Sequence, residues 1–254
     1  MSRPLPRLII VQHHPLETAG HISAWAASMG LSLHQVTAWQ AELPKLESLD
    51  AVLLLGGPYS VHDAQNLAWL RAEKEWLANA IANEHSVFGI CMGAQLLAQA
   101  LGAQVLPWQH VQNQQVLPWQ HVQNQQVRSL PSAELGWVEC AIADDFSALL
   151  GRTRRVLQWH SESFTLPTGA MLLGSSEQCT QQGFRMQRGA QALMGVQFHP
   201  EWDTDLLRGL ILELALPHEQ LALTSALDEH VAFAAQRALT ECLLGSWVTQ
   251  SGVF

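Results

Sequence analysis

The sequence predicts an α/β fold: a doubly wound, mostly parallel open sheet with helices on both faces, followed by a C-terminal helical extension. Short apolar runs alternate with stretches of helical periodicity up to Gly102. Continuous apolar runs of this kind are typical of parallel strands that are covered on both faces. Beyond Asp203 the chain is rich in Leu and Ala and is predicted to be helical, with a break at Pro217.

The first elements follow one another regularly along the chain. Apolar runs predict buried strands, and apolar residues spaced i, i+3, i+4 predict the helices between them. The expected strands are Leu8–Val11, Leu31–Val36, Ala51–Leu55 and Val87–Ile90. The expected helices are Ala19–Met29, 66–83 and Ala94–Leu101, and the glycines that follow the first and third of them are plausible stops.

A perfect tandem repeat follows these elements. Residues 105–115 (VLPWQHVQNQQ) recur letter for letter as residues 116–126. Each copy contains a proline, which disfavours a continuous helix. We expect a recent duplication that forms an extended loop or a lengthened β-hairpin on the surface, outside the catalytic sheet. The alternative is that Trp108 and Trp119 form a lid or a partner-docking arm.

The remaining elements complete a single predicted domain. Shorter strands are expected at Gly136–Cys140, Arg155–Gln158, Met171–Ser175 and Ala192–Phe198. We see no linker that divides the chain. The sequence therefore predicts one domain over residues 1–254, with a core of about 7–202 and a helical extension over 203–254.

Composition excludes several classes of function. Hydrophobic residues make up 48% of the chain and charged residues 14%, so a large core can form. The net charge of −9 argues against a nucleic-acid or membrane partner. No apolar run approaches the roughly 18 residues of a membrane span, and the N-terminal run is too short for a signal peptide. The four cysteines show no C-x-x-C pair or metal-ligand spacing. We therefore expect a reduced, cytoplasmic protein without a metal or other cofactor.

Cys91 lies where an apolar strand gives way to a helix, between Gly89 and Gly93. A sharp strand-to-helix turn brings backbone atoms close together, and glycines at these positions remove side chains that would collide. We call Gly89–Gly93 the elbow, because hydrolases present a serine nucleophile in this way. The start of the following helix should favour the reactive thiolate. The alternative is an inert, buried cysteine beside helix-packing glycines.

A thiol nucleophile needs a general base, which in turn needs an orienting carboxylate. His199 ends a later apolar strand, and Pro200 biases it toward an extended conformation. In an extended chain Glu201 faces the same side as His199 and can accept its other ring N–H. The carboxyl ends of parallel strands lie at one edge, so Cys91 and His199 can meet. By itself, His-Pro-Glu is equally consistent with a polar loop.

Acyl transfer also needs hydrogen-bond donors for the developing oxyanion. The backbone amide of Met92, directly after Cys91, is one candidate donor. The amide of Gly57 is a second, because Gly56–Pro58 follows another apolar strand. By itself, this glycine run is consistent with a plain turn.

The order of these motifs resembles the class I, triad-type glutamine amidotransferase family. The family pattern G-x-C-x-G-x-Q corresponds to 89–95, and His-Pro-Glu corresponds to His199–Glu201. Further stretches are similar to stand-alone members that resemble the glutaminase domain of GMP synthase: LGGPYSVHD, ELGW at 134–137, QWHSESFTLPTGAMLL at 158–173 and GVQFHPE at 195–201. The resemblance covers about residues 7–202 and implies a flavodoxin-like glutaminase fold. The tandem repeat departs from it, because ordinary members have a shorter connection there.

The resemblance implies hydrolysis of the glutamine side-chain amide through a γ-glutamyl thioester. It implies that Cys91 attacks, that His199 is first the base and then the acid, and that Glu201 orients His199. The other implied site residues are the oxyanion donors Gly57 and Met92 and the substrate contacts Gln95, His160 and Ser161.

Three functions are compatible with these motifs. The first is a glutaminase that releases ammonia for a separate synthetase chain. The second is a hydrolase of a free γ-glutamyl compound that needs no partner. The third is a catalytically silent regulatory protein with the same fold, against which the intact triad argues. Only about 50 residues follow Glu201, too few for a synthetase domain, so acceptor chemistry is expected on another chain.

Overall fold

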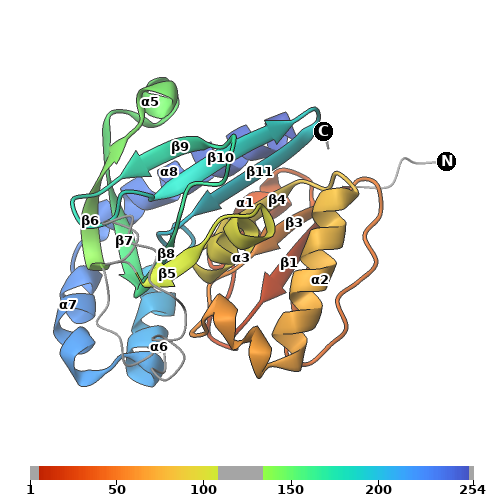
Figure 1. Ribbon diagram of the computed structural model, residues 1–254. Helices are drawn as coiled ribbons and strands as arrows, with labels where there is room; N and C mark the ends of the chain where they lie inside the picture. The colour runs from red at the N-terminus through yellow and green to blue at the C-terminus, as the bar shows by residue number, and fades with distance from the viewer. Residues whose placement is uncertain (1–5, 108–133, 252–254) are drawn as a thin grey trace.

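The computed structural model describes residues 6–107 and 134–251. This part of the chain forms a nine-stranded mixed sheet in the order β2-β1-β3-β4-β11-β10-β9-β6-β7 (Figure 1). A small second sheet pairs β5 (Val105–Pro107) with β8 (Glu162–Phe164). Helices lie on both faces of the large sheet, so the predicted doubly wound, mostly parallel α/β fold is confirmed.

Five neighbouring strands of the large sheet run parallel to one another. They are β2 (Ser32–Thr37), β1 (Arg7–Gln12), β3 (Ala51–Leu54), β4 (Val87–Ile90) and β11 (Gln191–Val196). Every residue of β3, β4 and β11 is buried, as expected for strands covered on both faces. The carboxyl ends of these strands meet at one edge, and that edge carries the candidate site.

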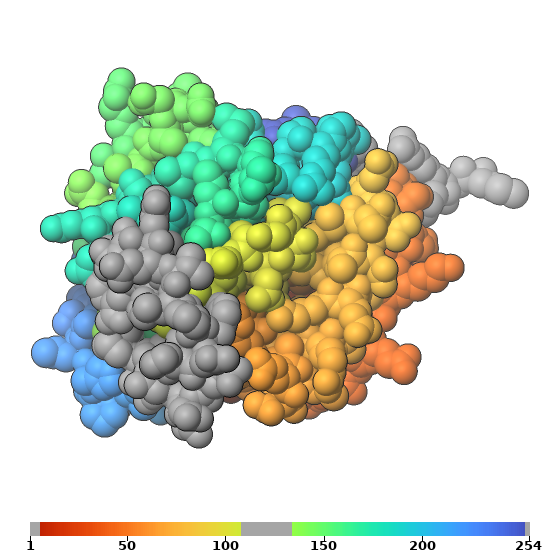
Figure 2. Space-filling model, viewed as in Figure 1, coloured from red at the N-terminus to blue at the C-terminus, as the bar shows by residue number. Residues whose placement is uncertain are grey.

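Two pairs of helices cover the two faces of the parallel strands. On one face α2 (Ala68–Ala82) contacts α3 (Met92–Ala100), and Figure 2 shows these two segments side by side in orange and yellow. On the other face α1 (Ile22–Ser28) contacts α8 (His230–Gln250). The helix predicted at 19–29 is α1, which begins three residues later than predicted, at Ile22.

The C-terminal helix α8 shares the core of the sheet. The indole of Trp247 is fully buried, donates to the carbonyl oxygen of Ala192 at 2.9 Å, and packs edge-on against Phe88. Burial of such a large aromatic side chain ties the extension firmly to the central strands. On this basis we propose that the core and the extension form one domain.

The other four strands form an antiparallel arm beyond β11. They are β10 (Gly183–Arg188), β9 (Met171–Ser175), β6 (Glu134–Ile142) and β7 (Thr153–His160). The strand predictions at 136–140, 155–158 and 171–175 are confirmed as parts of these strands. The sequence analysis missed β10, the short helix α5 (Asp144–Leu150) and the 3-10 turn Val61–Gln65.

Two further helices pack against the antiparallel arm. They are α6 (Thr204–Leu214) and α7 (Pro217–Leu227), which together with α8 confirm the predicted helical extension. Pro217 stands in the first turn of α7, where its missing N–H would have no helical partner, so it begins a helix there. Among the helices of the described residues, none is both long and apolar enough to cross a membrane.

The tandem repeat is described only at its start. Val105–Pro107 forms β5, which pairs with β8 beside α3. The expectation of a surface loop or hairpin, and the alternative of a lid or docking arm, concern residues 108–126, which lie outside the described residues.

Candidate active site

Cys91 occupies the turn between β4 and α3 in a positive-φ backbone conformation. Its φ is +50° and its ψ is −112°, which an L-residue other than glycine rarely adopts. The amide of Cys91 donates to the carbonyl oxygen of Val196 at 2.8 Å, which fixes the turn against β11. Strain held in this way by surrounding structure is typical of functional sites.

The two glycines of the elbow are required by close backbone packing. A Cβ atom at Gly89 would lie 2.5 Å from the carbonyl oxygen of Gly93, and one at Gly93 would lie 2.3 Å from the carbonyl oxygen of Leu54. Neither backbone oxygen can move without disturbing a strand or a helix. The interpretation of these glycines as spacers of a sharp turn therefore agrees with the structure.

Replacing Gly93 by alanine should lower the free energy of unfolding by about 3 kcal/mol or more, because the new methyl group meets the backbone of β3. Urea unfolding followed by tryptophan fluorescence measures the change. Gly209→Ala is the matched control: this glycine lies within α6 with open space around it, so alanine should be neutral or stabilising by up to about 1 kcal/mol. Equal stability of the two variants would contradict the packing argument.

His199 and Glu201 form a buried pair just beyond β11. His199 Nδ1 lies 2.9 Å from Glu201 Oε1, and the His199 backbone amide donates to Leu157 in β7. The indole of Trp202 stacks on the imidazole, with ring centroids 3.6 Å apart and an angle of 16° between the planes. The imidazole is thus fixed on one edge by a carboxylate and on one face by an aromatic ring.

One cavity of about 140 Å³ brings most of the predicted site residues together. This volume is smaller than the roughly 300–1,000 Å³ of pockets that hold drug-sized ligands, so it suits a small substrate. The predicted residues that line it are Gly57, Cys91, Met92, Gln95, His160, Ser161 and His199. Glu201 lies behind His199 and does not line the cavity.

The loop that carries Gly57 is supported by a buried histidine. A Cβ atom at Gly57 would lie 2.8 Å from His13 Cβ and 3.4 Å from Met92 Sδ, so the side chains of His13 and Met92 pack against Gly57. His13 Nδ1 lies 2.9 Å from the carbonyl oxygen of Leu55, and its Nε2 lies 2.8 Å from Glu73 Oε1. Burial alone would lower the pKa of His13, but the charge and hydrogen bond of Glu73 outweigh it, and the pKa is raised.

Glu73→Ala should destabilise the fold by about 3–5 kcal/mol at pH 6, because His13 loses its buried partner. The folded pKa of His13 lies above its ordinary value, so this stabilisation is full below about pH 6.5 and is lost as the pH rises through the folded pKa. Urea unfolding at several pH values should therefore show a gap from the parent that narrows with rising pH. The exposed neighbour Glu75→Ala should change stability by less than about 0.5 kcal/mol. A pH-independent gap would contradict the ion pair.

Two glutamine side chains connect the elbow to the facing strand. Gln95 Nε2 donates to the carbonyl oxygen of Glu162 at 3.1 Å and to Gln197 Oε1 at 3.2 Å. Gln197 Nε2 in turn contacts Cys91 Sγ at 3.6 Å. The amide nitrogen of Gln95 is thus occupied within the protein, and Gln197 is a sulfur contact that the sequence analysis missed.

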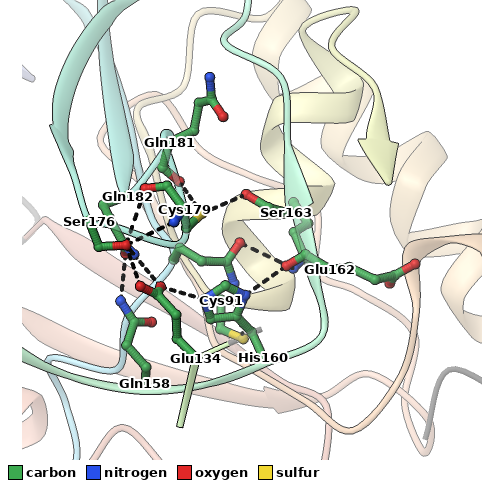
Figure 3. A network of polar contacts seen from close by, with 12 residues as sticks. Cys91, Glu134, Gln158, His160, Glu162, Ser163, Ser176, Cys179, Gln181 and Gln182 are labelled. Carbon is green, nitrogen blue, oxygen red and sulfur yellow. Dashed lines mark hydrogen bonds and ion pairs between the residues drawn. The ribbon is translucent and has the colours of Figure 1, made fainter. Parts of the chain in front are cut away.

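Glu134 is the centre of a buried polar network beside the cavity (Figure 3). Its carboxylate accepts hydrogen bonds from Ser176 and Gln182 and lies 3.1 Å from His160 Nε2. His160 Nδ1 faces the carbonyl oxygen of Glu162 at 2.9 Å. Both ring nitrogens of His160 are therefore engaged in holding the turn that lines the cavity.

Cys179 belongs to the same network. Its sulfur lies 3.2 Å from the hydroxyl of Ser163, and its amide donates to Ser176 (Figure 3). Donor atoms of Glu134, His160 and Cys179 lie within 4.8 Å of one another, a spacing compatible with a metal ion. Each of these three side chains already has hydrogen-bond partners in the protein, so the cluster is accounted for as structural support.

Burial dominates the electrostatics at the elbow. It raises the pKa of the Cys91 thiol, the charges of Glu17 and Glu201 raise it further, and the amide of Met92 acts the other way. Burial also lowers the pKa of His199 to about 4 and raises that of Glu201. The helix start does favour the thiolate through the amide of Met92, as expected, but burial and the two carboxyl groups outweigh it, so the pKa of the thiol is raised overall.

Several cavity residues were not anticipated from the sequence. They are the buried carboxyl groups of Glu17 and Glu162, the indoles of Trp159 and Trp202, and a wall from the end of α6 and the start of α7 formed by Leu214, Leu216 and Glu219. Burial raises the pKa of Glu162 to about 7, although a hydrogen bond with Ser60 opposes the shift. Trp159 and Glu162 lie within the family-like stretch 158–173, but the sequence assigns a role to none of these positions, because they reach the cavity through the tertiary fold.

The parallel sheet, the elbow cysteine and the histidine–carboxylate pair define the class of α/β proteins that present a thiol at a strand-to-helix turn. The chain belongs to the glutamine amidotransferase class-I family, whose model matches residues 22–215. Members of this family are enzymes, and membership supports glutamine amide hydrolysis or ammonia transfer in general terms.

Two curated relatives illustrate the family. The chain is 27% identical over 215 residues to the glutamine amidotransferase-like protein YfeJ of Salmonella typhimurium, covering 81% of this chain and 80% of that protein. It is 28% identical over 163 residues to a glutamine-hydrolyzing GMP synthase subunit of Thermoplasma volcanium, covering 63% of this chain and 66% of that one.

Solved structures show the same fold. A glutamine amidotransferase of Thermotoga maritima is 22% identical, with a TM-score of 0.73, and the match covers 97% of this chain and 99% of that one. A glutamine amidotransferase of Methylobacillus flagellatus is 22% identical, with a TM-score of 0.77, and the match covers 97% of this chain and 96% of that one.

Proposed function

We propose that this protein hydrolyses the side-chain amide of glutamine, or of a γ-glutamyl compound, through a thioester on Cys91. The observation that carries the proposal is that Cys91, strained at the elbow, and His199, held by Glu201, line one small cavity. A nucleophile, a base and an orienting carboxylate are the parts that covalent acyl transfer requires.

The proposed reaction has two halves. In the first, the thiol proton of Cys91 passes to His199 as sulfur attacks the amide carbon. The carbon–nitrogen bond then breaks and the proton moves from His199 to nitrogen. Ammonia, or the amine of a γ-glutamyl compound, departs, and a γ-glutamyl thioester remains on Cys91. In the second, water attacks the thioester and gives a proton to His199. The carbon–sulfur bond breaks, glutamate is released, and the proton returns to sulfur.

The neutral resting state suits this mechanism. An imidazole with a pKa of about 4 is unprotonated at neutral pH and is ready to accept the thiol proton. Glu201 accepts from Nδ1, which leaves Nε2 for the reacting groups. We propose that the thiolate forms only as substrate is attacked, because burial opposes a free charge beforehand.

We assign the oxyanion to the backbone amides of Gly57 and Met92, two residues that line the same cavity as Cys91. We further propose that the backbone near His160–Ser161 contacts the γ-glutamyl group, since the side chain of His160 is already engaged. Gln95 lines the same cavity and completes the proposed contacts.

The fate of the ammonia distinguishes the candidate functions. The relative of Thermoplasma volcanium is named as one subunit of GMP synthase, which favours a separate synthetase chain as partner. A partner-independent γ-glutamyl hydrolase is the second candidate, and the small cavity favours a free compound over a protein substrate. A silent regulatory protein would not need the strained cysteine and the paired histidine.

Release of glutamate by the isolated protein tests the proposal, because glutamate is the product common to all candidate substrates, whereas ammonia is released only from glutamine itself. Glutamine and a panel of γ-glutamyl amides are assayed, each with the Cys91→Ala variant as background. Turnover of glutamine alone supports the glutaminase, and faster turnover of a γ-glutamyl amide supports the free hydrolase. If no substrate releases product at a rate above that of the Cys91→Ala background, the enzymatic assignment is overturned.

A further inference from the structure

Glu17 is a buried carboxyl group in the segment between β1 and α1. Only 6% of its surface is exposed, it lines the cavity together with Cys91 and His199, and its Oε2 has no hydrogen-bond partner among the described residues. The indole of Trp202 favours the charged form of this carboxyl group. A buried carboxyl oxygen without a partner is costly, so the position of Glu17 calls for a functional explanation.

The carboxyl group of Glu17 lies next to the pair of His199 and Glu201. Oxygen or nitrogen atoms of Glu17, His199 and Glu201 all lie within 4.8 Å of one another. A Cβ atom at Gly56 would lie 2.8 Å from His199 Cε1 and 3.5 Å from Glu17 Oε2. The glycine at this position therefore leaves the space across which the carboxyl group and the imidazole face each other.

The backbone holds Glu17 at this distance. The Glu17 amide donates to the carbonyl oxygen of His14 at 3.0 Å, which forms a turn after β1. Gly20, at φ +50°, follows the turn, and a Cβ atom there would lie 2.0 Å from the carbonyl oxygen of Glu201. The segment is thus packed directly on the residues that carry the pair.

The titratable groups that face Glu17 are two histidines, a carboxyl group and a thiol. His199 and Glu201 face it from the segment after β11, His13 from the end of β1, and Cys91 from the elbow. No lysine or arginine lines the cavity in the part of the chain that the structure describes. The imidazolium of His199 that forms during catalysis would therefore lie beside this carboxylate, and the charge of His13 also acts on it.

We propose that Glu17 is a positioning residue that acts through His199: its carboxylate is a second negative group beside the imidazole and stabilises the imidazolium formed when Cys91 attacks. This inference rests on the proposed function. Glu201 holds the Nδ1 edge of the ring, and Glu17 supplies charge from the side left open by Gly56. Two carboxylates offset the effect of burial, which otherwise lowers the pKa of His199 and keeps the imidazole neutral.

The ionisation of Glu17 gives the proposal a measurable pH signature. Burial raises the pKa of Glu17 to about 7, the charge of His199 opposes the shift, and that of Glu201 adds to it. The carboxyl group therefore gains its charge as the pH rises through about 7. Glu162 has a pKa of about 7 as well and lines the same cavity, and the pKa of His13 is raised above its ordinary value, so both are competing sources of a step near this pH.

Alkylation of Cys91 by iodoacetamide, followed by mass spectrometry from pH 5 to 9, tests the proposal without any substrate. The parent and Glu162→Gln should both show a step near pH 7 in the alkylation rate, and Glu17→Gln should lack it. Glu42→Gln, at an exposed position, controls for surface charge and should match the parent. In a His199→Ala background Glu17→Gln should have no further effect, because the proposed coupling passes through the imidazole.

Steady-state hydrolysis of glutamine gives the second readout. Glu17→Gln should lower kcat by about 10-fold or more at pH 8 while KM changes less than about 3-fold, and Glu17→Asp should restore part of the loss. An unchanged alkylation profile, or a change confined to KM, would overturn the proposal; the latter would assign Glu17 to an ammonium group of the substrate. If the parent hydrolyses nothing, the alkylation profile still tests Glu17, so the two proposals fail separately.

Discussion

Replacing Cys91 by serine is expected to lower amide hydrolysis by at least about 10³-fold while the protein stays folded. The hydroxyl is the weaker nucleophile, and the cavity offers no strong base to ionise it, because burial lowers the pKa of His199 to about 4. The substitution keeps nearly the same shape at a residue that is 7% exposed, so stability should change little. Ammonia release and urea unfolding, measured on the same preparations, separate the two effects.

The other cysteines provide matched controls for this prediction. Cys140 and Cys179 are buried away from the elbow turn, and Cys242 is exposed on α8. A diazo-ketone analogue of glutamine should add once per chain, at Cys91, in each single-alanine variant of the other three. Peptide mapping that places the label elsewhere, or rapid turnover by a well-folded Cys91→Ser protein, would remove Cys91 as the nucleophile.

The elbow could be predicted from the sequence because its geometry is local. Within five residues, a turn this sharp leaves no room for a side chain two residues before or two residues after Cys91, and the contacts of Gly89 and Gly93 with neighbouring backbone show why. The pair of His199 and Glu201 could be predicted for a similar reason. Glu201 reaches Nδ1 of His199 across only two residues, so their separation follows from the extended backbone.

Residues that reach the cavity through the tertiary fold could not be found in this way. Glu17 lies in a polar turn whose sequence resembles any loop, and only the pairing of β1 with β3 carries it to the site. Gln197 precedes His199 by two residues, but its contact with Cys91 depends on the register of β11 against β4. Such contacts are set by strand order, which periodicity does not specify.

The ionisation of Cys91 shows the same limit. The start of α3 is a local feature and does lower the thiol pKa through the amide of Met92. Desolvation depends on everything that covers the sulfur, and two distant carboxyl groups add to it. Together they outweigh the helix, so the helix start alone does not decide the direction in which the pKa of the substrate-free thiol shifts.

The C-terminal helices show that sequence periodicity can find an element without its role. The helical extension was predicted, yet Leu214 and Leu216 form part of the cavity wall beside Trp159. Trp159 is itself fixed by a hydrogen bond from its indole to Glu219 Oε1 at 3.0 Å. The C-terminal extension therefore shapes the cavity. Its contact with Trp159 of β7 is expected to influence which substrate fits, a question that the proposed function leaves open.

His199→Ala is expected to lower kcat/KM by about 10³-fold or more, and Glu201→Gln by a smaller factor of about 10–10². Without the imidazole, the thiol loses its paired base while burial still raises its pKa. With glutamine at position 201, the ring keeps its place, because Trp202 stacks on it and the backbone amide of His199 donates to Leu157.

The two variants also differ in how the remaining activity depends on pH. In Glu201→Gln the imidazole still titrates, but it loses a carboxylate, so its pKa should fall and the residual rate should reach its plateau at lower pH. In His199→Ala the residual rate should rise with pH as hydroxide replaces the missing base, because the raised pKa of Cys91 then limits thiolate formation. Trp202 and Leu157 hold the ring in both the parent and Glu201→Gln. If Glu201→Gln lowered kcat/KM as much as His199→Ala does, the carboxylate would do more than orient and stabilise the imidazole. The roles of the pair would then have to be reassigned.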